Sequence, residues 1–122
     1  MIIDLETMEP TKLPVEVAVS AITMAELAAG PHATTDADER ARRQDRLQRA
    51  EAAFDPLPFD GEAARAYGRL YSAVAASGRK ARGARAVDLL IAATAWAADL
   101  ALYTRNGDDF RAIDHLVDVI VL

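Results

Sequence analysis

The feature that most constrains the fold is an apolar helix predicted over residues 86–98, in which Asp88 is the one charged side chain. Leucine and isoleucine alternate there with alanine, the strongest helix former, and neither Gly nor Pro interrupts the segment. We place Asp88 at the start of this helix, where the macrodipole favours an acid. By itself it is therefore explained equally well as a cap and as a functional residue. The preceding loop, residues 79–85, contains four cations and no anion.

The composition is that of one soluble globular domain. Its 122 residues are 52% hydrophobic and 27% charged, which excludes a disordered chain and allows a sizeable core. There is no cysteine, so disulfides, thiolate chemistry and cysteine-rich zinc sites are excluded. A chain without cysteine fits the reducing cytosol, and we expect a cytoplasmic protein.

Hydropathy argues against a membrane-spanning segment, and the net charge argues against a general nucleic-acid-binding surface. The longest apolar run, around residues 89–98, is too short to span a bilayer, and the N-terminus has no basic region followed by an apolar one. A formal net charge of −5 argues against indiscriminate nucleic-acid binding. It leaves room for a local basic patch, which residues 79–85 supply.

Strands and helices alternate along the predicted chain. Strands are expected at residues 15–19, 101–104 and 117–122, with a brief strand or extended link at 55–59. Helices are expected from Ser20 to a stop at Gly30, from Asp36 to Phe54, from Asp60 to about Ser77 and, briefly, from Asp108 or Asp109. The buried stripe expected in the helix after Asp60 is Ala64, Tyr67, Leu70, Tyr71 and Val74. This alternation predicts an α/β fold with a parallel sheet covered by helices.

Several acids follow the predicted strands or open the helices between them. Sites in such folds form at the carboxyl ends of strands. Glu26 lies one or two helical turns past one strand, and Asp108 and Asp109 lie just past another. Carboxylates gathered at one edge repel one another, and a divalent cation relieves that repulsion. With no cysteine, and no histidine near these positions, the hard oxygen ligands point to Mg²⁺ or Mn²⁺.

A metal ion of this kind activates water and stabilises charge on a phosphoryl group in phosphodiester hydrolysis. The basic loop would then hold the phosphates of the substrate. Within that loop Arg82 and Arg85 are better placed to face Asp88 than the earlier cations are. A static salt bridge to Asp88 is the alternative for both arginines.

Three segments carry a family resemblance. Residues 20–30, 88–95 and 103–110 resemble three of the four signature blocks of the PIN domain, in the family's order, and are most similar to those of VapC toxins. The resemblance implies a single three-layer α/β/α domain over residues 1–122, with a mostly parallel sheet. It also implies a Mg²⁺-dependent endoribonuclease that cleaves RNA and is held inactive by a cognate VapB antitoxin. The family commonly pairs as homodimers.

Site residues follow from the resemblance by position. Glu26 matches the family's second acid and Asp88 its third. The fourth falls in the turn of residues 106–109, with Asp109 as the first choice, Asp108 as the second and Asn106 as a polar substitute.

The first acidic block departs from the family pattern, and two alignments are compatible with it. Residues 1–4 could be the first strand, with Asp4 as the first acid, although Leu5 and Glu6 then stand where small hydroxyl residues belong. We favour the other alignment, in which residues 1–6 are the helix that follows the first acid. The first strand and its aspartate would then lie upstream of Met1.

Two other functions fit the same residues. A PIN remnant without its first acid would act only by binding an antitoxin or by dimerising. A metal-dependent phosphoesterase of the same topology would prefer small phosphate esters over RNA.

Overall fold

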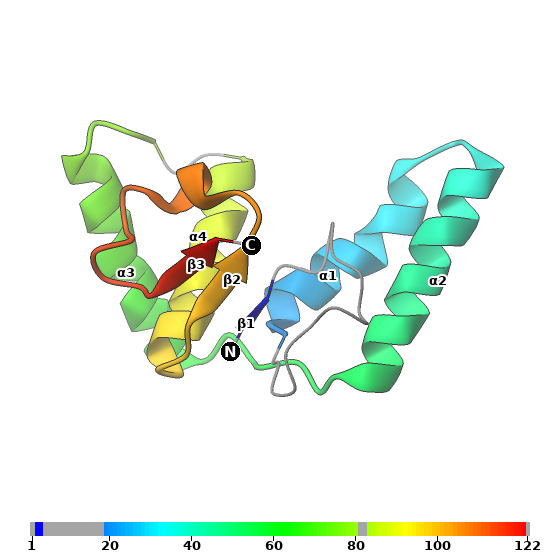
Figure 1. Ribbon diagram of the computed structural model, residues 1–122, viewed down its shortest axis with the longest axis horizontal. Coiled ribbons are helices and arrows are strands. Elements are labelled where there is room, and N and C mark those ends of the chain that lie inside the picture. The colour runs from blue at the N-terminus through cyan, green and yellow to red at the C-terminus, as the bar shows by residue number, and fades with distance from the viewer. Residues whose placement is uncertain (1, 4–18, 81–82, 122) are drawn as a thin grey trace.

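The computed structural model describes residues 2–3, 19–80 and 83–121 (Figure 1). The elements along the chain are β1 (Ile2–Ile3), α1 (Ala21–Ala29), the 3₁₀ helix η2 (Gly30–Ala33), α2 (Ala37–Ala53), α3 (Gly61–Ala76), α4 (Ala84–Ala97), β2 (Leu102–Thr104), the 3₁₀ helix η3 (Gly107–Phe110) and β3 (Val119–Val121).

The named strands form a parallel sheet in the order β1-β2-β3. Ile2 pairs with Leu102, and Leu102 pairs with Val119. A separate parallel bridge joins Ser20 to Leu57, where Leu57 N–H donates to the Val19 carbonyl at 2.8 Å. The parallel sheet and the extended link at residues 55–59 were both expected from the sequence and are confirmed.

The position of β1 corrects the alignment that we favour for the N-terminus. Ile2 and Ile3 form a strand beside β2, so the prediction of a helix over residues 1–6 is wrong for these two residues. Two β-branched side chains suit a pleated strand, and six residues are too few for a helix to form by itself. Asp4 follows β1 directly in the sequence, as in the other alignment. Asp4 itself, and residues 15–18 of a predicted strand, lie outside the described residues.

Side-chain caps begin three helices where the sequence predicts them. The side chains of Ser20, Asp36 and Asp60 accept hydrogen bonds from backbone N–H groups in the first turns of α1, α2 and α3, at 3.0, 2.8 and 2.9 Å. Helix α1 ends at Ala29, before the predicted stop at Gly30, and the chain continues as the 3₁₀ turn η2.

The helix that carries Asp88 begins two residues earlier than predicted. Gly83 is its N-cap, with φ of +56° and no side-chain cap, so α4 starts at Ala84 and Asp88 lies in the second turn. The cap explanation of Asp88 is therefore wrong. The predicted stripe on α3 is also rotated, because its buried residues are Ala63, Ala66, Leu70 and Val74, whereas Tyr71 is 51% exposed.

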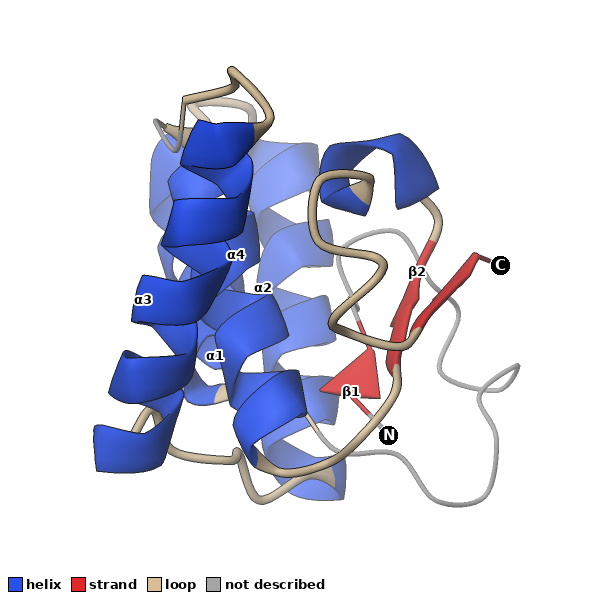
Figure 2. Ribbon diagram, turned by 90° about the vertical axis from the view of Figure 1, so that its left-hand side faces the viewer, coloured by secondary structure: helices blue, strands red, loops and turns tan. Residues whose placement is uncertain are grey.

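The four α-helices lie on one side of β2 and β3 (Figure 2). The main core joins α3, α4, the sheet and the segment after η3; its fully buried side chains include Leu70, Leu102, Ile113 and Val117. A smaller core of Val19, Leu27 and Ala50 belongs to the hairpin of α1 and α2, in which α1 contacts α4 and α2 is the helix farthest from α3 (Figure 1). Across the described ranges, no helix has the length and hydrophobicity needed to cross a membrane.

Candidate functional site

The predicted acids lie on three elements that meet around α4. Helix α4, with the half-buried Asp88, contacts both α1 and η3. Helix α1 carries Glu26, and η3 carries Asp108 and Asp109, and these three side chains are exposed. The fold therefore brings together elements that are far apart in the sequence.

The acidic side chains themselves do not complete a metal site within the described ranges. Among those residues, no three Asp, Glu or His side chains are arranged so that they could hold a metal ion. Asp4, which comes directly after β1, is not among them. The donor set is nevertheless of the right chemistry, because carboxylate oxygens are the ligands that Mg²⁺ and Mn²⁺ prefer.

The turn after β2 distinguishes its two acids. The Asp108 carboxylate pairs with Arg111 at 2.8 Å. The backbone carbonyl of Asp108 accepts a hydrogen bond from Arg79 Nη1 at 3.5 Å. The Asp109 backbone N–H donates to the Asn106 carbonyl at 3.1 Å. The Asp109 carboxylate forms no ion pair or hydrogen bond with the residues that the structure describes. This arrangement leaves Asp109 more available than Asp108 to bind a ligand.

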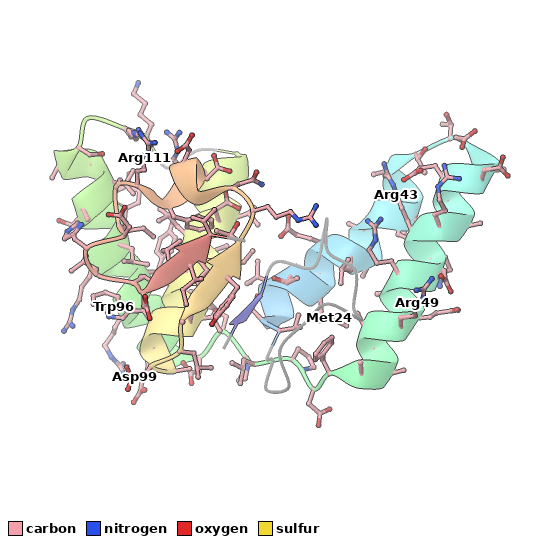
Figure 3. All side chains as sticks on the ribbon, viewed as in Figure 1. Met24, Arg43, Arg49, Trp96, Asp99 and Arg111 are labelled. Carbon is pink, nitrogen blue, oxygen red and sulfur yellow. The ribbon has the colours of Figure 1, made fainter. Side chains whose placement is uncertain are left out.

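The turn is held in place from both of its sides. Thr104, the buried last residue of β2, accepts a hydrogen bond from Asn106 N–H at 3.1 Å. Gly107 packs so closely against Val121 of β3 that a Cβ at this position would overlap Val121 Cγ2. A cavity of about 580 Å³ adjoins the turn and is lined also by Arg105, Arg111 and Asp114. Figure 3 labels Arg111 beside η3.

A second cleft separates α1 from α2 and contains Glu26. It has a volume of about 360 Å³, and its polar lining is Thr23, Glu26, Glu39, Arg43 and Arg46. Thr23 is buried, with Oγ1 3.0 Å from Ser20 Oγ. The cleft is therefore lined by Glu26, the predicted second acid, from α1 and by the cations Arg43 and Arg46 from α2.

The basic loop is only partly described. Arg82 lies outside the described residues. Arg85 is half-buried in the first turn of α4, three residues before Asp88. Arg79 reaches the η3 turn, a contact that the sequence does not predict because the two residues are 29 positions apart.

The ion pairs of α2 that the structure describes are formed between residues of this helix. Hydrogen bonds from Arg42 and Arg43 lower the pKa of Glu39, and a hydrogen bond from Arg49 lowers the pKa of Asp45. Arg43 also donates to the Gly30 carbonyl at 2.9 Å, and Arg40 donates to the carbonyls of Pro31 and Thr34 at 3.2 and 3.0 Å. Arg40 and Arg43 of α2 therefore also fix the turn that leads into the helix.

Comparison with known proteins decides the family. The PIN domain profile matches residues 6–116. Ribonuclease VapC5 of Mycobacterium tuberculosis is 38% identical over 110 residues, which are 90% of this chain and 78% of that protein. The chain belongs to the VapC group of the PIN-domain family. The predicted family resemblance and the α/β fold class are thereby confirmed.

Solved structures agree with this family assignment. VapBC-5 from Mycobacterium tuberculosis, a member of the VapBC family of toxin–antitoxin systems, matches this PIN domain with a TM-score of 0.81 and 34% identity. That match covers 99% of this chain and 95% of the other. FitAcB from Neisseria gonorrhoeae matches with a TM-score of 0.76 and 28% identity, over 98% of this chain and 95% of the other.

Proposed function

We propose that this PIN domain is a metal-dependent endoribonuclease and the toxin of a type II toxin–antitoxin pair. The main support for the proposal is the 38% identity to a ribonuclease of the VapC group over 90% of this chain. The meeting of α1, α4 and η3, which bear the predicted acids, supports it independently.

The metal site of this proposal is made of carboxylates. Glu26, Asp88 and Asp109 would hold Mg²⁺ or Mn²⁺ together with Asp4, and Asp108 is the second choice for the η3 position. When bound, the ion would supply charge stabilisation at a phosphoryl group and a more acidic water. The fit rests on the chemistry of the donors and on β1, which brings the residue before Asp4 into the sheet beside β2.

The substrate phosphates are assigned to Arg82 and Arg85 in the same proposal. A cation in the first turn of a helix opposes the macrodipole, so Arg85 gains nothing from its place at the start of α4. Its guanidinium is better matched to an anion outside the helix, such as a phosphate, or to Asp88. A loop of four cations recognises the RNA backbone rather than its sequence.

A VapB-type antitoxin is the proposed inhibitory partner. Support comes from the similarity to VapBC-5, which is described as a toxin–antitoxin system. A homodimer and a cytoplasmic location complete the proposal, and both rest on the family resemblance and on the cysteine-free composition.

The test compares RNA cleavage by acid-to-amide variants. Glu26→Gln and Asp88→Asn should each lower the rate of RNA cleavage in Mg²⁺ by at least about a hundredfold, because loss of a metal ligand costs no less than loss of its supporting partners. Asp55→Asn, an exposed acid of the link between α2 and α3, is the matched control and should leave the rate unchanged. Full activity of Asp88→Asn would contradict the proposal.

A PIN remnant that only binds its antitoxin is the second candidate. The observation that favours it is that no metal-holding group of three acids or histidines is found within the described ranges. Binding of a VapB-type antitoxin by a chain that neither binds Mg²⁺ nor cleaves RNA would identify the remnant. Cleavage that depends on Asp4 would exclude it.

A further inference from the structure

Arg46 differs from the other arginines of α2. Arg40 donates to backbone carbonyls, Arg42 and Arg43 pair with Glu39, and Arg49 pairs with Asp45. The Arg46 side chain forms no hydrogen bond or ion pair with any residue in the described part of the chain. It is the cation of this helix that remains available for an external anion.

Arg46 also lines the cleft that contains Glu26. Glu39, Arg43 and Arg46 follow at helical spacing and share one face of α2, opposite Thr23 and Glu26 of α1. Figure 3 shows Arg43 on the side of α2 that faces α1. The cleft thus has an acid from one helix and a free guanidinium from the other.

The two other charged residues of α2 that line the cleft, Glu39 and Arg43, are paired with each other. Arg43 Nε donates to Glu39 Oε1 at 3.0 Å, and Arg43 Nη1 donates to the Gly30 carbonyl at 2.9 Å. Glu39 also accepts hydrogen bonds from Arg42 at 2.7 and 3.0 Å. Arg43 therefore competes only weakly with Arg46 for an anion that enters the cleft, and Glu39 competes only weakly for a cation.

We infer that Arg46 binds a backbone phosphate of the RNA substrate that enters the cleft beside Glu26. The inference rests on the proposed function and adds a substrate-binding residue outside the basic loop. A guanidinium presents a planar fork of donors that matches two phosphate oxygens. Because the chain has a net charge of −5, local cations of this kind are needed to hold an RNA strand near the acids.

The test measures RNA binding without cleavage. A fluorescent single-stranded RNA of mixed sequence is titrated with the Asp88→Asn protein in Mg²⁺, at several salt concentrations. Adding Arg46→Ala should raise Kd roughly tenfold, as expected for loss of one charge-assisted contact. It should also reduce the slope of log K against log salt by about 0.7, which is one phosphate contact on a single strand. Arg46→Lys should keep the slope and lose part of the affinity.

Arg49→Ala is the matched control. It removes one positive charge from the same helix, but Arg49 does not line the cleft and pairs with Asp45 rather than with Glu39, so Kd and the salt slope should change less than about twofold. Arg46 is exposed, so its replacement should leave the melting temperature nearly unchanged.

Three results would overturn the inference in different ways. If the unmodified protein cleaves RNA while Arg46→Ala behaves like Arg49→Ala, Arg46 is not a substrate contact and the proposed function stands. Weaker binding of an antitoxin peptide, with unchanged RNA binding, would likewise assign the cleft to the protein partner. If the unmodified protein neither binds nor cleaves RNA, the proposed function fails and the inference fails with it.

Discussion

At the scale of single residues, Gly107 determines how closely the η3 turn approaches β3. A Cβ at this position would overlap Val121 Cγ2. Gly107→Ala should destabilise the protein by about 1 kcal/mol, the low end for an overpacked site, because Val121 is exposed and can turn partly away. Thermal unfolding measures the loss.

The double variant Gly107→Ala/Val121→Ala is the control for this prediction. It removes Cγ2 and leaves Val121 Cβ at 3.6 Å, an ordinary contact. Stability should then recover relative to Gly107→Ala. Equal losses in the single and double variants would show that the contact with Val121 is not the cause.

The neighbouring acids Asp108 and Asp109 should differ in their effect on activity. Asp108 is tied to Arg111, whereas the Asp109 carboxylate makes no ion pair or hydrogen bond within the described ranges. Asp109→Asn is expected to lower RNA cleavage by at least about tenfold more than Asp108→Asn does. The reason is that Asp109→Asn would remove a metal ligand, whereas Asp108→Asn would remove only an exposed ion pair. Steady-state cleavage rates decide between them, and the reverse order would move the ligand to Asp108.

At the scale of elements, Glu39 of α2 accepts charged hydrogen bonds from Arg42 and Arg43 of the same helix, and Arg43 also donates to the Gly30 carbonyl at the end of α1. Arg42 and Arg43 lower the pKa of Glu39, so the folded pKa lies below the unfolded one. The stabilisation is then present above the unfolded pKa of about 4.3, and is lost as pH falls through the lower folded pKa.

Titration of the Glu39 carboxyl by NMR tests this prediction directly. In the unmodified protein the Glu39 pKa should lie below the ordinary glutamate range, and in Arg42→Ala it should move up towards it. An ordinary Glu39 pKa in the unmodified protein would contradict the hydrogen bonds seen at 2.7 to 3.0 Å.

Local signals explain which elements could be predicted from the sequence. Ser20, Asp36 and Asp60 bind the N–H groups of their own first turns, so the starts of α1, α2 and α3 depend on neighbouring residues alone. Helix α4 begins instead after Gly83, an N-cap without a side-chain hydrogen bond, so Asp88 lies in the second turn and not in the predicted first turn.

Tertiary contacts decided what the sequence could not predict. Periodicity shows that α3 has an apolar stripe, but the small residues Ala63 and Ala66, which pack inward, select the face that is buried. Strand β1 is only two residues long and depends on pairing with β2. The acids predicted for the site come from sequence blocks, whereas the Arg79 contact and the cleft with Arg46 arise from the fold.

At the scale of the whole molecule, two cores of unequal size predict unequal local stability. Helix α4 buries Leu89, Ile91 and three alanines, whereas Ala50 is the buried residue of α2. Amide hydrogen exchange should therefore be at least about tenfold slower in the centre of α4 than in the centre of α2, because α2 opens without disrupting the main core. Equal protection of the two helices would show a single cooperative unit.

Metal-dependent RNA cleavage is tested by assaying the unmodified protein in Mg²⁺, then in excess EDTA, and again after Mg²⁺ is restored in excess. We expect cleavage in Mg²⁺, its loss in EDTA, and its recovery when Mg²⁺ is restored. Cleavage that continues in EDTA, or a folded protein that never cleaves RNA in Mg²⁺ or Mn²⁺, would contradict this expectation.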